Sequence, residues 1–147
     1  MTISKTNNKN RNYKLIIGRH CSCKAPNYLI GAVKEAVSYD ANALMVHLGP
    51  PQNSRNRPSL SKLKVSEFKQ ILIENNINID NVIVHGPYIV NLANTSKKET
   101  FHWSVEFLKK EISKMEAIGL KILVLHPGSA VNTPIEEALS QVAEGIN

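Results

Sequence analysis

The sequence predicts an α/β protein with a parallel sheet, and three observations lead to this prediction. Four short apolar runs alternate with four stretches of helical apolar spacing along the 147 residues. The runs are continuous rather than alternating, which is typical of strands buried on both faces of a parallel sheet. No hairpin signal joins consecutive runs, so each strand is expected to reach the next through a right-handed crossover. Four such units can form an open sheet or half of an eight-unit barrel.

The composition is that of one globular domain. Hydrophobic residues make up 42% of the chain and charged residues 20%, and both values are ordinary. No apolar run approaches the ~20 residues needed to cross a bilayer. Because the chain also opens without an apolar signal segment, we expect a cytoplasmic protein that does not enter a membrane.

The net charge of +6 suggests an acidic partner, but its distribution matters more than its total. Four of the six charges come from Lys5, Lys9, Arg11 and Lys14, which have no acidic residue beside them. The polar stretch 1–12 is predicted to be a disordered basic tail, followed by one domain over 13–147. Evidence for a nucleic-acid surface must therefore come from local clusters.

The first half of the domain is predicted to contain two strands and two helices. The first strand spans 13–18 and ends in Arg19 and His20, and a helix follows from Pro26 through Tyr39. The second strand spans 43–48. The apolar stripe of the second helix then recurs at helical spacing, at Val65, Phe68, Ile71 and Leu72.

Between the second strand and the second helix, residues 49–58 form a rigid, basic loop. The loop contains three prolines, several polar amides and two arginines. A solvated connector is one interpretation. A functional loop is at least as well supported, because loops of this length in compact domains usually bind something.

The second half repeats the pattern, with a third strand over 82–85 and a fourth that ends at His126. Between them lies the clearest helix, and Gly119 is suited to end it in the left-handed conformation. The last helix is expected to start with Thr133 as cap and Glu136 completing a capping box. Its predicted buried stripe is Ile135, Leu139, Val142 and Ile146.

Two histidines occupy equivalent places in this plan. His85 and His126 each close a strand and are followed by Gly and Pro, which turn the chain outward. In parallel α/β proteins the carboxyl ends of the strands form the rim where ligands bind. Neutral imidazole is a good zinc ligand, so the pair is the best candidate metal site. No carboxylate sits at a strand exit, and the glutamates fall on helices, where a solvated face is expected.

The other candidate residues carry weaker signals. His20 also closes a strand, so either a role supporting the metal ligands or a structural hydrogen bond is open. His47 lies within an apolar strand and is expected to be packed, whereas His102 opens a helix and is expected to be exposed. Cys21 and Cys23 are expected to be free thiols, because a lone Cys-x-Cys pair is weak evidence for a metal site.

Four ordered motifs resemble the N-terminal part of the endonuclease IV family of apurinic/apyrimidinic endonucleases, also called AP endonuclease family 2. They are LIIGRHCS at 15–22, MVHLGPPQNSR at 45–55, VHGPYIVNLA at 84–93 and VLHPGS at 124–129. The resemblance implies a TIM barrel with three zinc ions at the carboxyl rim of its strands. It also implies a DNA repair activity (deoxyribonuclease IV) that cuts the backbone on the 5′ side of an abasic site in double-stranded DNA.

The resemblance also assigns roles to individual residues. His85 and His126 match the first two zinc ligands, which the family places on one ion. Tyr88 matches an aromatic residue that reaches into the DNA. The loop from Gln52 to Arg57 matches one that enters the minor groove at the lesion, which agrees with its basic, rigid character. The DNA-binding residues implied are Gln52, Asn53, Arg55 and Tyr88.

The family's next motif, a strand ending in a glutamate that bridges two zinc ions, would begin just past Asn147. Residues 13–147 are therefore expected to be the N-terminal half of the domain, the first four of eight βα units, with at most one partial zinc site. We expect such a half to be inactive alone, and to self-associate or pair with the missing half through its open sheet edges. Two alternatives are a non-catalytic DNA-binding remnant and another metal-dependent barrel enzyme such as a sugar isomerase.

Overall fold

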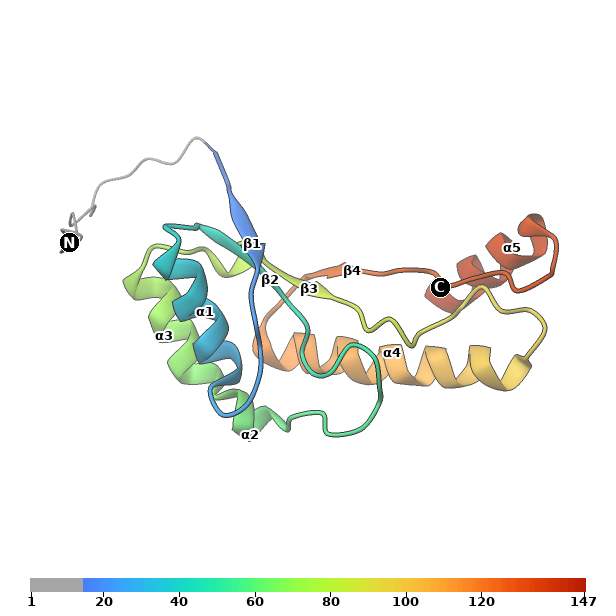
Figure 1. Ribbon diagram of the computed structural model, residues 1–147, viewed down its shortest axis with the longest axis horizontal. Coiled ribbons are helices and arrows are strands. Elements are labelled where there is room, and N and C mark those ends of the chain that lie inside the picture. The colour runs from blue at the N-terminus through green and yellow to red at the C-terminus, as the bar shows by residue number, and fades with distance from the viewer. Residues whose placement is uncertain (1–14) are drawn as a thin grey trace.

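Four parallel strands form the centre of the molecule in the computed structural model, which describes residues 15–147. They are β1 (Gly18–His20), β2 (Ala43–Val46), β3 (Val82–His85) and β4 (Ile122–Val124), and they lie in the order β1-β2-β3-β4 (Figure 1). Every neighbouring pair is parallel. The prediction of parallel strands in sequence order is confirmed. The predicted tail 1–12 and the start of the first predicted strand lie outside the described residues.

The helices connect these strands as expected for crossovers. They are α1 (Tyr28–Ser38), α2 (Leu60–Leu63), α3 (Val65–Glu74), α4 (Lys98–Ile118) and α5 (Ile135–Ile146), with a 3-10 turn, η1 (Ile79–Asn81), before β3. Figure 1 shows α1 and α3 side by side beneath one end of the sheet, and the long α4 running below β3 and β4. No helix among residues 15–147 is long and apolar enough to span a membrane.

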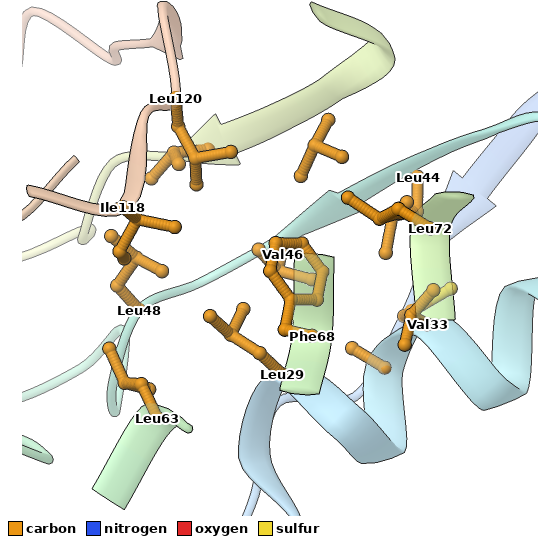
Figure 2. Packing of buried hydrophobic residues seen from close by; sticks show 14 of the residues in the cluster. Leu29, Val33, Leu44, Val46, Leu48, Leu63, Phe68, Leu72, Ile118 and Leu120 are labelled. Atoms are coloured by element: carbon orange, nitrogen blue, oxygen red, sulfur yellow. The ribbon is translucent and has the colours of Figure 1, made fainter. Parts of the chain in front are cut away.

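The main core lies between the sheet and the α1–α3 pair. Phe68 of α3 and Leu29 of α1 are fully buried against Val46 of β2, as Figure 2 shows. Burial of one such side chain contributes about 1.5–3 kcal/mol. A second, smaller core joins the segment after β3 to α4 through Leu92 and Phe101.

The two faces of the sheet differ in cover. Leu44 and Val84 point toward the helices and are buried. The strand register sets Met45 beside Ile83, and Ile83 beside Ile122, so these three form one row on the opposite face. Met45 and Ile83 are only half-buried, and Ile122 is 44% exposed. Within residues 15–147 the sheet is therefore covered by helices on one face only.

Both edges of the sheet are also open within the described residues. β1 pairs only with β2, and β4 pairs only with β3. The segment 15–17 before β1 is apolar and about 60% exposed at each residue, although the side chain of Asn42 bonds to its backbone at Ile17 N and Leu15 O. An open edge with apolar side chains beside it is a surface that another strand can pair with.

Three strand boundaries differ from the sequence prediction. β1 starts at Gly18, later than expected, and β2 and β4 end at Val46 and Val124 rather than at 48 and His126. The early ends follow from the prolines downstream, because a proline has no N–H for the ladder and turns the chain away.

The predicted start and buried stripe of α5 are wrong. The Thr133 hydroxyl donates to the Ala130 carbonyl at 2.5 Å instead of capping the helix, which begins at Ile135 after Pro134. Ile135 and Leu139 are 57% and 61% exposed, and Ala138 is the one buried residue of the helix. Of the predicted stripe, Val142 packs against the second core, while Ile135, Leu139 and Ile146 stay exposed in the described chain. By contrast, Gly119 ends α4 with φ +90° as predicted.

Candidate metal centre and nucleic-acid interface

His85 and His126 meet at the carboxyl end of the sheet. Their Nε2 atoms are 3.2 Å apart, and their rings are tilted by 37°. His85 Nδ1 lies 2.8 Å from the carbonyl oxygen of Gly86. Because a carbonyl only accepts, Nδ1 is the donor, and in the neutral ring Nε2 has a lone pair that lies within hydrogen-bond distance of His126 Nε2. A donated Nδ1–H of this kind is what orients a metal-binding histidine.

The spacing of the two nitrogens suits zinc. Two nitrogen ligands at 2.0–2.1 Å from a tetrahedral zinc ion are about 3.3 Å apart. The observed 3.2 Å between the Nε2 atoms agrees with that separation. Among residues 15–147, no group of three or more His, Cys, Asp or Glu side chains is arranged to hold a metal ion. The described chain therefore presents two ligands of a site, and the metal assignment of His85 and His126 stays a prediction.

A tight contact between two loops fixes the position of His126. The backbone N–H groups of Leu92 and Ala93 donate to the Pro127 carbonyl, and the side-chain oxygen of Asn91 accepts from Ser129 N–H. Gly128 has φ +105°, and a Cβ there would lie 2.0 Å from the Asn91 oxygen. Only glycine fits this position. The loop after β4 is thus held against the loop after β3.

His47 belongs to the same rim, which corrects the prediction that it is packed within a strand. It lies one residue past β2, and its ring centroid is 4.6 Å from that of His85. Its Nδ1 donates to the His85 carbonyl at 2.9 Å. Burial first, and then the neighbouring His85 and His20, lower the pKa of His47 to about 4. His47 is followed closely by Gly and Pro, as His85 and His126 are, and that shared signal would have revealed it.

His20 completes a group of four histidines. Its ring is 4.8 Å from the His47 ring and stacks on that of His85 at 5.8 Å. Burial, and then the charge of His85, lower the pKa of His20. His20 is therefore a neutral neighbour of the candidate ligand near pH 7, and its supporting role stays a prediction.

Tyr88 stands over the histidines with an exposed ring. Its centroid is 5.2 Å from that of His85 and 5.5 Å from that of His126, and the residue is 53% exposed. The Tyr88 N–H donates to the carbonyl of Pro51 at 2.8 Å. This bond ties the aromatic residue to the basic loop.

The tip of the loop is exposed and locally ordered. Gln52, Asn53 and Arg55 all lie on the surface. The Asn53 side chain accepts from Arg55 N–H at 3.0 Å, and Asn56 takes a left-handed conformation at φ +56°. A side chain that bonds its own backbone two residues on orders the turn locally.

Arg57 and Glu111 depart from the expectations for a loop and a solvated helix face. Their side chains are 11% and 3% exposed, and they form an ion pair between the loop and α4. The predicted solvated position of Glu111 is wrong, because the loop covers that part of α4. The only sequence signal for the burial of Glu111 is its place beside the apolar stripe of the helix.

The remaining candidates do not join the rim. Cys21 is buried and Cys23 half-buried, and both are free thiols, as expected. Burial raises the pKa of Cys23 to about 12, which makes it a poor nucleophile and metal ligand. His102 is exposed on α4, and its Nδ1 contacts the Lys98 carbonyl at 2.8 Å.

The parallel sheet with crossover helices and a histidine-lined carboxyl rim defines a TIM-barrel type of protein. A family model described as xylose isomerase-like TIM barrel matches residues 33–147, and the chain belongs to this family. The described chain accounts for four strands of such a barrel. The predicted fold class, a partial TIM barrel, is confirmed.

Sequence comparison with individual proteins gives more specific relatives. The chain is 48% identical over 138 residues to probable endonuclease 4 of Mesoplasma florum, which covers 91% of this chain and 47% of that protein. It is 44% identical over 135 residues to probable endonuclease 4 of Ureaplasma parvum, covering 92% and 44%. The chain spans about half the length of the curated relatives it matches. The resemblance found in the motifs is confirmed.

A solved structure gives the same fold. The crystal structure of endonuclease IV from Thermus thermophilus superposes with a TM-score of 0.68 at 22% identity. The match covers 88% of this chain and 46% of that one. The half-length coverage agrees with four strands where a closed barrel has eight.

Proposed function

We propose that residues 13–147 form the N-terminal half of the TIM-barrel domain of a zinc-dependent DNA repair endonuclease, which cuts on the 5′ side of abasic sites. The observation that carries this proposal is the 3.2 Å approach of His85 Nε2 to His126 Nε2, directly beside the exposed Tyr88. The names of the relatives, probable endonuclease 4, support an endonuclease activity. The exposed loop tip, with Arg55 beside Gln52 and Asn53, favours DNA as substrate over a sugar.

The histidines at the carboxyl end of the sheet would form one metal site. His85 and His126 would hold a zinc ion, which when bound supplies a Lewis acid and a water of lowered pKa. The Gly86 carbonyl keeps the His85 proton on Nδ1, so Nε2 faces the site unprotonated. His47 and His20 stay neutral beside it. Neutral neighbours matter, because a nearby imidazolium would repel a cation.

The loop tip and Tyr88 would face the DNA. Gln52, Asn53 and Arg55 are exposed on the segment that shares a hydrogen bond with the Tyr88 backbone. Arg55 would contact phosphate and add affinity for any duplex. The Tyr88 ring would stack in the space that an abasic site leaves, which makes it the discriminating contact.

This chain alone is expected to bind DNA without cutting it. A hydrolytic zinc centre needs a third ligand, and a centre of several ions needs carboxylates that bridge them. Among the described residues only two imidazole nitrogens converge. The missing ligands would come from the other half of a complete barrel, docked on the open edges β1 and β4.

Zinc affinity tests the metal site. Calorimetric titration of the metal-free 147-residue chain should show one zinc bound, and His85→Ala or His126→Ala should weaken it by at least about tenfold. His102→Ala is the matched control, since that histidine is exposed on α4 away from the rim. Equal zinc affinity in all four proteins would refute the assignment.

DNA binding tests the interface. Tyr88→Ala should lower the preference for an abasic over an intact duplex by about tenfold, since one stacked ring contributes about 1–3 kcal/mol. Arg55→Ala should weaken both complexes and reduce the salt slope by about one. Lys109→Ala, on the exposed side of α4, is the control. Identical affinities for both duplexes in wild type and Tyr88→Ala would remove Tyr88 from the interface.

The non-catalytic alternative rests on the lack of a third converging ligand in residues 15–147. Mixing this chain with the remaining half of the Mesoplasma florum relative distinguishes half of an enzyme from a non-catalytic DNA-binding remnant. Zinc-dependent nicking of an abasic duplex by the mixture, and by neither part alone, supports half of an enzyme. Binding with no nicking in any mixture supports a DNA-binding remnant.

A further inference from the structure

We infer that the Arg57–Glu111 pair is a positioning device that holds the basic loop and Tyr88 in one fixed arrangement at the rim. The DNA part of this inference rests on the proposed function, and the structural part does not.

The pair is buried and fully engaged. Arg57 Nε donates to one carboxylate oxygen of Glu111 at 3.0 Å, and Nη2 contacts the other oxygen. The guanidinium also lies over the Phe107 ring at 5.0 Å, and Lys114 approaches Glu111 at 3.5 Å. Two-point pairing of this kind fixes the orientation of the arginine as well as its distance.

The remaining arginine nitrogen closes the loop on itself. Nη1 donates to the Pro50 carbonyl at 2.9 Å, which joins the end of the loop to its start. The adjacent Pro51 carbonyl accepts from Tyr88 N–H at 2.8 Å. A Cβ at Gly49 would lie 3.0 Å from the arginine Cζ, so the backbone is packed directly on the guanidinium. One buried arginine therefore connects the loop base and α4, and reaches Tyr88 through Pro51.

The Arg57–Glu111 pair is better explained by its effect on the position of the loop than by a contribution to stability. Replacing a buried ion pair by apolar side chains of similar size is often neutral for stability, because desolvation offsets the attraction. What apolar side chains cannot replace is the bond to Pro50 and the two-point orientation. The pair is thus expected to set where the exposed tip stands relative to α4.

The test is the charge-free double variant Arg57→Met/Glu111→Leu in the 147-residue chain. The matched control is Lys109→Met/Glu106→Leu, which removes a 2.9 Å pair from the same helix where both side chains are exposed. We expect Tm to stay near wild type in both. Amide hydrogen exchange at 52–57 and at Tyr88 should become about tenfold faster in the first variant only.

DNA affinity is the second readout. The first variant should bind an abasic duplex about tenfold more weakly, with a smaller loss on intact duplex, because misplacing a contact group by about 1 Å is costly. Arg57→Lys keeps the charge but loses the two-point pairing of the guanidinium. Its affinity for the abasic duplex should lie between those of wild type and the double variant.

Unchanged exchange at 52–57 and Tyr88 in a folded Arg57→Met/Glu111→Leu protein would overturn the inference. So would equal effects in the control variant. If wild type fails to bind DNA, the proposed function fails, while the exchange comparison still decides whether the pair holds the loop.

Discussion

The covered centre of the sheet and its uncovered margins differ in how their apolar residues are used. At the centre, Phe68 of α3 and Val46 of β2 meet in a closed core. At the margins, Ile122 of β4 and Leu139 of α5 have apolar patterns equally suited to burial, yet both are exposed. An amphipathic pattern therefore indicates which side chains an element can bury. Whether they are buried depends on a second element that packs against them.

The strongest test of this difference lies in the core. Phe68→Ala should destabilise the chain by about 3–5 kcal/mol, because the ring is fully buried and its loss leaves a cavity. Urea unfolding followed by circular dichroism measures this directly. A loss below about 1 kcal/mol would show that the centre is no better packed than the margins.

A smaller but local effect is expected at the rim. Gly128→Ala should cost about 2 kcal/mol or more, because its Cβ would meet the Asn91 oxygen and its backbone is left-handed. The displaced loop should also weaken zinc binding through His126. Gly31→Ala is the control, since that glycine lies within α1 and its added Cβ would contact only the Asn27 Cβ at 3.1 Å. Similar zinc affinity in both variants would contradict the loop contact.

The pH dependence of the metal-free chain should also distinguish the rim. The folded pKa of His47 is about 4, below the ordinary 6.5, so the unfolded chain binds more protons between these values. Stability is therefore full above about pH 6.5 and falls as pH drops toward 4, by on the order of 1–2 kcal/mol from this residue. His47→Asn should flatten the urea midpoint against pH over this window. The same slope in wild type and variant would exclude His47 as its source.

The smallest effect on stability is expected at α5. Ile135→Ser/Leu139→Ser should change the free energy of unfolding by less than about 0.5 kcal/mol, since both side chains are exposed. The same change should reduce self-association in sedimentation experiments, if the uncovered margins are where chains meet. A large loss of stability would mean that α5 is covered by its own chain.

Most of the fold could be predicted because each unit carries its own local signals. The apolar run 82–85 defines β3 without help from other residues, and Gly119 marks the end of α4. The rim position of His85 follows from the same logic, since parallel strands end together. These predictions depend on short-range chemistry alone.

Two of the three failures have the opposite cause, a contact with residues distant in the sequence. The apolar run around His47 predicts a strand interior, but the ladder ends at Val46 because a proline follows four residues later. The position of Glu111 predicts a solvated face, because nothing in α4 itself shows that Arg57 will cover it. The spacing of Leu139 predicts burial, because its helix shows only the pattern and not the partner. Long-range contacts decide the cases of Glu111 and Leu139, whereas the strand end before His47 follows from a proline nearby in the sequence.

The order β1-β2-β3-β4 has a consequence for assembly on the ribosome. Within the described sheet, each of β2, β3 and β4 pairs with the strand made just before it, so each finds that partner already synthesised. The sheet can grow by addition at one end, with each crossover helix docking as it emerges. At every stage the newest strand has unpaired backbone N–H and C=O groups along one edge, with which the next strand can pair. In the described sheet β4 is such an edge strand.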